Sequence, residues 1–162
     1  MQNEKALLAA GCFWGAEDIL RNIPGVINTE VGYTGGVTEN PVYNDVKTGT
    51  TGHAEAVLVE FDPSVVTYAS ILEYFFRLHD PTTRNRQGND IGTQYRSAIF
   101  YFSEQQKFEA EKAKALAATS GRWSQPIATE IVPASTFYAA EEYHQDYLVK
   151  NPRGYTCHWL RD

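Results

Sequence analysis

The order of strand-like and helix-like segments is the feature of this 162-residue sequence that most limits its possible folds. Apolar, strand-like patterns occupy residues 4–10, 26–33, 53–61 and 95–102. Apolar residues recur at helical spacing over residues 16–23 and 66–79. The opening order is therefore βαββαβ, which is typical of a ferredoxin-like core. We predict an α+β fold, a two-layer sandwich in which helices cover one face of a mixed sheet.

The second half of the chain continues this alternation and then loses its periodicity. Residues 103–119 begin with a Ser-x-x-Gln capping box and predict a helix, followed by a strand over 127–132 and a helix over 139–148. Residues 151–162 have no periodic pattern. We expect one catalytic domain over residues 1–162, of which 151–162 form an irregular, mobile tail.

Composition and charge exclude several classes of protein. The formal net charge is -6 and no run of Lys and Arg occurs, which argues against binding to nucleic acid. The apolar segment 6–10 is far shorter than the ~20 residues that span a bilayer, and no signal segment opens the chain. We expect a cytoplasmic monomer without a membrane anchor. Two cysteines in a reducing compartment indicate redox or catalytic chemistry more than a structural disulfide framework.

Cys12 lies in the stretch GCFWGAE, where the first strand ends and a helix begins. Unpaired backbone N–H groups and the helix dipole at such a site lower the pKa of a thiol, although Glu17 and Asp18 in the first turns oppose the effect. The alternative is that Cys12 is a small buried apolar residue. Phe13 and Trp14 are either core aromatics or the walls of a pocket for an apolar group held against the sulfur.

Glu55 is the second candidate, because it shares one face of its strand with Val57, Val59 and Phe61. A carboxyl group among apolar residues has a raised pKa and can stay protonated near neutral pH, where it would act as a proton donor. The alternative is a position at a solvent-facing strand end.

Two polar loops, residues 34–52 and 80–92, are long enough to indicate a functional role. Tyr43 lies in the first loop, and Asp90 and Tyr95 lie in or just after the second. Asp90 could equally serve only to form a turn, and Tyr95 could be an ordinary strand residue.

Metal binding is not indicated by the spacing of the candidate ligands. The Glu141-x-x-His144 spacing of carboxylate-bridged metal sites occurs once, without the second copy that such sites require. Cys12, His53, Cys157 and His158 could in principle bind zinc, but no C-x-x-C pair is present. We therefore expect no metal and no cofactor.

Taken together, these segments resemble one family, the A-type peptide methionine sulfoxide reductases. The combination of GCFWG, GHAE and GTQYRS is highly specific. The matching segments follow the family's order over nearly the whole chain and lie at residues 11–17, 25–36, 48–63, 75–101, 140–148 and 151–158.

The resemblance implies a substrate and a role for each candidate residue. The family reduces the S epimer of methionine sulfoxide, free or in oxidised proteins, to methionine. By this resemblance Cys12 would attack the sulfoxide sulfur and Glu55 would protonate the sulfoxide oxygen. The resemblance implies that the remaining residues bind the substrate. Phe13 and Trp14 would enclose the methyl group, and Tyr43 and Tyr95 would donate hydrogen bonds from their hydroxyl groups to the sulfoxide oxygen. Asp90 would help to order the polar side of the site.

The C-terminal segment departs from a common family pattern. Many members have a cysteine directly after NP-x-GY and a second one in a glycine-rich tail, whereas this chain has Thr156 there, Cys157 next and its last residue at 162. The resemblance then implies that Cys12 becomes a sulfenic acid, that Cys157 converts it to a disulfide, and that thioredoxin reduces the disulfide. Bridging requires α-carbons within about 7 Å, so the tail would have to reach Cys12.

Two other functions remain open from the residues alone. Cys12 could belong to a cysteine hydrolase or a peroxidase that uses His53 or His144 as its base. The chain could also be a binding module that recognises oxidised methionine without converting it.

Overall fold

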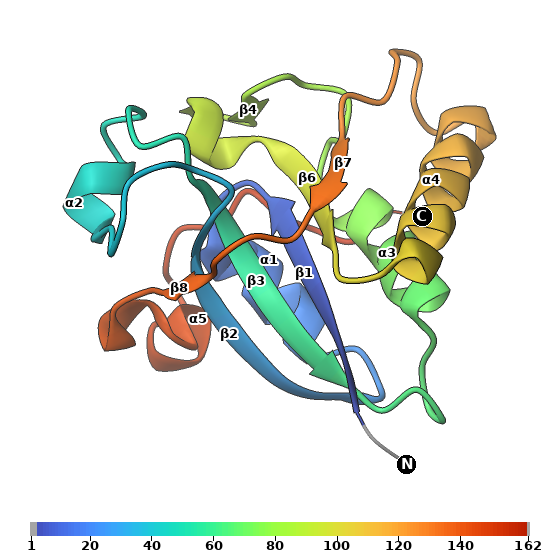
Figure 1. Ribbon diagram of the computed structural model, residues 1–162, viewed down its shortest axis with the longest axis horizontal. Helices are drawn as coiled ribbons and strands as arrows, with labels where there is room; N and C mark the ends of the chain where they lie inside the picture. The colour runs from blue at the N-terminus through green and yellow to red at the C-terminus, as the bar shows by residue number, and fades with distance from the viewer. Residues whose placement is uncertain (1–2, 162) are drawn as a thin grey trace.

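The computed structural model describes residues 3–161 and contains a six-stranded sheet in the order β7-β6-β1-β3-β2-β8 (Figure 1). Its strands are β1 Glu4–Ala10, β2 Val26–Thr34, β3 Ala54–Phe61, β6 Ser97–Tyr101, β7 Glu130–Pro133 and β8 Tyr138–Ala139. Neighbouring strands are antiparallel except β6 and β7, which are parallel, so the sheet is mixed. A separate hairpin pairs β4 (Arg86–Gln87) with β5 (Asp90–Ile91).

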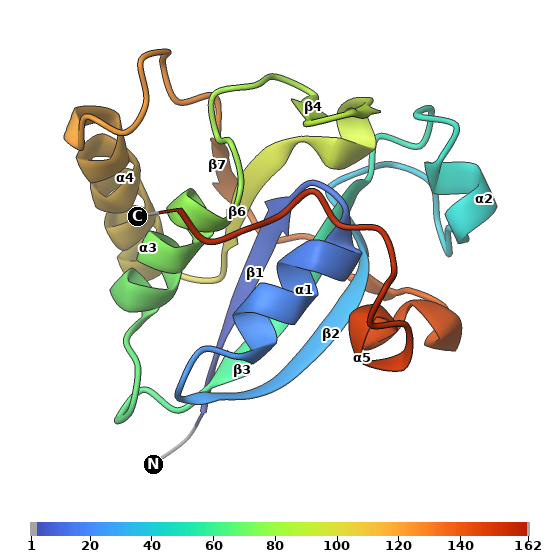
Figure 2. The ribbon, with the colours of Figure 1, turned by 180° about the vertical axis from the view of Figure 1, so that it is seen from behind.

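The helices pack mainly on one face of this sheet. They are α1 Phe13–Arg21, α2 Tyr43–Val46, α3 Tyr68–Leu78, α4 Glu104–Thr119 and α5 Tyr147–Lys150. Figure 2 shows α1 lying across β1, β3 and β2, while α3 packs beside it and α4 packs on α3, β6 and β7. The predicted α+β class with a mixed sheet is confirmed; the narrower ferredoxin-like description stays a prediction.

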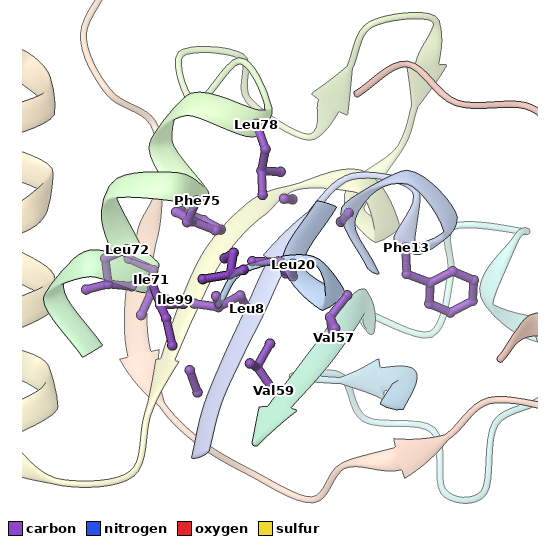
Figure 3. Close-up of a cluster of buried hydrophobic side chains, with 14 of the residues drawn as sticks. Leu8, Phe13, Leu20, Val57, Val59, Ile71, Leu72, Phe75, Leu78 and Ile99 are labelled. Carbon is purple, nitrogen blue, oxygen red and sulfur yellow. The ribbon is translucent and has the colours of Figure 1, made fainter. Parts of the chain in front are cut away.

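The hydrophobic core lies between the sheet and helices α1 and α3 (Figure 3). Leu8 of β1, Leu20 of α1 and Phe75 of α3 are fully buried there, and each such side chain stabilises the fold by about 1.5–3 kcal/mol. The opposite face of β1 carries Leu7 and Ala9, which are buried under the segment that joins β7 to β8. β1 is therefore apolar at successive positions because both of its faces are covered.

One predicted helix is wrong. Residues 139–148 form the end of β8, a 3₁₀ turn at Glu142–His144 and only the start of α5. Asp146 has a φ of +52°, which no continuous helix permits. The side chain of Gln145 instead bonds both backbone groups of Val31, at 2.9 Å each. These contacts with β2 override the helical pattern of the segment.

Two smaller differences concern the polar segments. Tyr95 belongs to a 3₁₀ turn, Thr93–Tyr95, so the predicted strand begins only at Ser97. The first long loop contains the short helix α2, and the second contains the β4–β5 hairpin. Among residues 3–161, no helix combines the length and the apolar character needed to cross a bilayer.

Candidate active site

Cys12 is the N-cap residue of α1, two residues after Ala10, the last residue of β1. Gly11 between them has a φ of +89°, and a Cβ there would lie 2.7 Å from the Cβ of Gln87, so the turn requires glycine. Cys12 is 8% exposed. Burial raises the pKa of its thiol, the charge of Glu55 raises it further, and a hydrogen bond with the Trp14 backbone lowers it. The helix terminus lowers the thiol pKa as expected, but burial and Glu55 raise it by more, so Cys12 is protonated at neutral pH.

Glu55 lies on β3 and is only 2% exposed, so the alternative of a solvent-facing strand end is wrong. Its Oε1 accepts a hydrogen bond of 3.1 Å from the backbone N–H of Phe13, in the first turn of α1. Burial raises the pKa of Glu55 to about 8, although this hydrogen bond lowers it. The carboxyl group is therefore mostly protonated at neutral pH, beside the residue that follows Cys12.

Phe13 and Trp14, in the first turn of α1, both contact His144, with ring centroids 5.2 Å and 5.7 Å from that of the imidazole. Phe13 is buried, with its ring centroid 5.7 Å from that of Tyr33. Trp14 is half-buried, donates from Nε1 to Nδ1 of His144 at 2.9 Å, and stacks on Tyr147 at 3.8 Å. The indole is thus fixed by one hydrogen bond and one stacked ring.

Tyr43 in α2 and Tyr95 in the 3₁₀ turn are both half-buried. Burial raises the pKa of both phenols, and the charge of Glu55 is the next cause in each case. The charge of Cys12 raises both pKa values as well. The two polar loops therefore place two neutral hydroxyl groups close enough to Glu55 and Cys12 to interact with them electrostatically.

Asp90 in β5 faces the C-terminal segment. Its Oδ2 accepts a hydrogen bond of 3.2 Å from the Tyr155 hydroxyl group and lies 3.9 Å from Sγ of Cys157. Cys12 and Cys157 are both free thiols, and a charge on Cys157 raises the pKa of Cys12. The structure therefore brings all eight candidate residues to one region around the N-terminus of α1.

Two further residues of the site, Glu141 and His144, appear in the sequence analysis only as a rejected metal motif and, for His144, as the base of an alternative enzyme. Glu141 accepts hydrogen bonds of 2.9 Å from the Tyr33 hydroxyl group and from the backbone N–H of Tyr43, so it links β2 to α2. His144 is 1% exposed and holds Trp14. Their i, i+3 spacing was visible in the sequence, but it suggested a metal motif and not these contacts.

Of the two histidines that a cysteine hydrolase could use as its base, His53 has both ring nitrogens in contacts, whereas Nε2 of His144 has no hydrogen-bond partner among the described residues. His53 accepts from the backbone N–H of Gly36 at 3.0 Å and contacts the carbonyl of Thr38 at 2.6 Å, so both of its ring nitrogens are engaged. His144 receives the Trp14 hydrogen bond at its Nδ1. Within the described range, 3–161, no cluster of three or more His, Cys, Asp or Glu side chains could hold a metal ion.

Gly15, in α1, provides the space in which the C-terminal segment packs, and Gly15→Ala is expected to displace that segment. A Cβ at this position would overlap Oγ1 of Thr156 and Nδ1 of His158. Such overpacking costs about 1–3 kcal/mol, against a gain in helix propensity of about 1 kcal/mol. We expect faster amide hydrogen exchange at residues 156–158 and a lower free energy of unfolding. Unchanged exchange there would contradict the described packing.

Comparison with known families gives one consistent match. A family model described as peptide methionine sulfoxide reductase matches residues 4–161. The peptide methionine sulfoxide reductase MsrA of Methanothermobacter thermautotrophicus is 56% identical over 158 residues, which are 98% of this chain and 93% of that protein.

Solved structures show the same similarity. The reduced form of Mxr1 from Saccharomyces cerevisiae has a TM-score of 0.94 and 42% sequence identity, and the alignment covers 99% of this chain and 93% of Mxr1. Mxr1 in complex with Trx2 has a TM-score of 0.68 and 28% identity, with 99% of this chain and 91% of that one covered.

Proposed function

The chain belongs to the peptide methionine sulfoxide reductase family and is an oxidoreductase that reduces methionine sulfoxide, and we propose that Cys12, Glu55 and Cys157 carry the reaction. The observation that supports this best is the pair formed by a buried thiol and a protonated carboxyl group at the N-terminus of α1. The substrates are the S epimers of free methionine sulfoxide and of oxidised methionine in proteins.

The acid makes the attack possible. A sulfoxide sulfur is a poor electrophile until its oxygen is protonated or strongly hydrogen-bonded, and Glu55 with its pKa of about 8 carries a proton for it at neutral pH. Protonated Glu55 also adds no negative charge beside Cys12, which removes the second cause of the raised thiol pKa. The hydroxyl groups of Tyr43 and Tyr95 donate to the same oxygen, and Asp90 orders the polar side.

The first step is a two-electron oxidation of Cys12. Its sulfur attacks the sulfoxide sulfur and forms an S–S bond, and the S–O bond breaks as the oxygen leaves as water with the Glu55 proton and the thiol proton. Water then attacks Sγ of Cys12 and returns a proton to Glu55, and the S–S bond breaks with its electron pair on methionine, which leaves. The oxygen of this water stays on Cys12 as a sulfenic acid, whose hydrogen replaces the former thiol hydrogen. Glu55 has regained its proton by the end of the step.

Phe13 and Trp14 form the apolar side of the substrate site. They would enclose the terminal methyl group of methionine sulfoxide and so place its sulfur next to Cys12. The stacked Tyr147 and the hydrogen bond to His144 fix the indole of Trp14, which favours one orientation of that methyl group.

Cys157 and thioredoxin regenerate the thiol. Sγ of Cys157 attacks the Cys12 sulfenic acid, a disulfide forms and water leaves. Thioredoxin then reduces this disulfide by thiol–disulfide exchange. The solved complex of the similar Mxr1 with Trx2 supports thioredoxin as the reductant.

Cys157→Ala separates the two half-reactions. The variant is expected to release one methionine per protein and to accumulate the Cys12 sulfenic acid, because no second thiol can resolve it. Thioredoxin-supported turnover should fall to the background, and the measurement is methionine per protein with and without thioredoxin. Normal recycling of the variant by thioredoxin would show that Cys157 has no such role.

The activity itself is tested by incubating the protein with methionine S-sulfoxide and a thiol reductant. Methionine release over time is the expected result, and the R epimer should remain unchanged. Bound but intact sulfoxide would instead indicate a binding module, and peroxide reduction faster than sulfoxide reduction would indicate a peroxidase.

A further inference from the structure

His158 is the one buried side chain of residues 151–161, and it packs together with Thr156 on the N-terminal turn of α1. His158 is 8% exposed, and its Nε2 lies 2.5 Å from the carbonyl oxygen of Ala10, two residues before Cys12. Its ring fills the space that Gly15 leaves open on α1. In Figure 2 the last segment of the chain crosses the same end of α1.

The hydrogen bond fixes the state of the imidazole. A carbonyl oxygen only accepts, so Nε2 of His158 carries the hydrogen. Burial and the positive charge of Arg161 lower the pKa of His158 to about 4, so the ring is neutral near pH 7 and Nδ1 has a free lone pair. This Nδ1 lies 3.9 Å from Sγ of Cys157, within the range of a weak sulfur contact.

Cys157 is thereby held between two acceptors. Oδ2 of Asp90 lies 3.9 Å from its Sγ on the hairpin side, and Nδ1 of His158 lies on the α1 side. Tyr155 adds its hydroxyl group to the same Asp90 oxygen. Charged and titratable groups that act on this cluster include Cys12 at the N-terminus of α1, His79 after α3, and Arg161 of the same C-terminal segment.

We propose that His158 is the positioning residue that docks Cys157 at the Cys12 end of α1, so that the resolving thiol stands ready when the sulfenic acid forms. This inference depends on the proposed two-cysteine reaction. In that reaction the Cys157 S–H and the Cys12 S–OH bonds break, the S–S bond forms, and the hydrogen and hydroxyl group leave as water. Docking raises the effective concentration of the Cys157 thiol near Cys12 above the value that an undocked C-terminal segment would give.

A matched pair of substitutions isolates the hydrogen bond to Ala10. His158→Gln keeps an N–H at the position of Nε2, whereas His158→Asn keeps a polar side chain that is too short to reach the carbonyl. After addition of methionine S-sulfoxide without reductant, the disulfide is followed as loss of both free thiols. We expect the Asn variant to form it roughly tenfold or more slower than the unchanged protein, and the Gln variant to stay within about threefold.

The first methionine should be released at the same rate in both variants, because His158 has no part in the attack on the sulfoxide. Amide exchange at residues 155–158 should be faster in the Asn variant only, and Arg153→Ala, an exposed change in the same segment, should change neither rate. Equal rates of disulfide formation in the Gln and Asn variants, whether fast or slow, would overturn the role of His158. Absence of methionine release from the unchanged protein would instead overturn the proposed reaction.

Discussion

Cys12→Ser is expected to abolish methionine release completely, a loss of at least about 10⁴-fold in rate. A serine hydroxyl group is a far weaker nucleophile than a thiol toward sulfur. It also cannot take up the two oxidising equivalents of the sulfoxide, because oxygen has no counterpart of the sulfenic acid. The measurement is methionine formed from methionine S-sulfoxide with dithiothreitol, which bypasses thioredoxin.

The variant also tests the site without disturbing the fold. Serine is close to cysteine in size, and Cys12 caps α1, where serine is a favourable residue. Thermal unfolding should therefore stay close to that of the unchanged protein while activity is lost. Cys157→Ala is the matched control, because it retains the first release of methionine. Turnover by the Cys12→Ser protein would show that Cys12 is not the nucleophile.

The sequence predicted the parts of the fold that follow from local periodicity. Helices α1 and α3 lie where apolar residues recur at helical spacing, and β1, β2, β3 and β6 lie where strand-like apolar segments occur. The capping box predicted at the start of α4 is half present: Oγ of Ser103 accepts from the backbone N–H of Gln106 at 3.2 Å, but Oε1 of Gln106 accepts from the backbone N–H of Phe102 instead of that of Ser103. Each of these signals lies within a few residues of the element that it specifies.

The segment after β7 was not predictable in this way. Its conformation depends on contacts with residues more than a hundred positions away, such as Gln145 with Val31 and Glu141 with Tyr33. Asp146 adopts its left-handed conformation where its backbone N–H donates to Glu17 at 2.9 Å. Periodicity within residues 139–148 carries no information about these partners.

The candidate site shows the same division. Position and residue type made Cys12 and Glu55 candidates with alternatives left open, and the apolar face around Glu55 predicted the raised carboxyl pKa that its burial produces. Whether the pKa of the Cys12 thiol is raised or lowered could be decided only from the structure. The burial of its sulfur and its proximity to Glu55 depend on how α1 packs on β3. The docking of Cys157 through Asp90 and His158 likewise depends on long-range packing.

Glu55→Gln is expected to lower the rate of methionine release by about 10²–10⁴-fold, the usual contribution of a positioned general acid. The amide keeps the hydrogen bond to the Phe13 backbone N–H and the size of the side chain, but it has no proton to give to the sulfoxide oxygen. In the unchanged protein the rate should decline as the pH rises through about 8, because Glu55 then loses its proton. The variant should lack this decline, and an identical decline in both would assign it to another group.

The effect of Glu55→Gln on the free energy of unfolding should depend on pH. The pKa of Glu55 rises from its ordinary value of 4.5 to about 8 on folding, so between these values the folded state binds more protons than the unfolded state. Stability therefore falls as the pH rises from about 4.5 to about 8, by up to roughly 5 kcal/mol in total. Glutamine does not ionise, so the variant lacks this loss of stability. Urea unfolding at pH 5 and pH 9 should show the Gln variant gaining several kcal/mol relative to the unchanged protein at the higher pH. A stability difference independent of pH would mean that Glu55 is not the buried acid on which the chemistry depends.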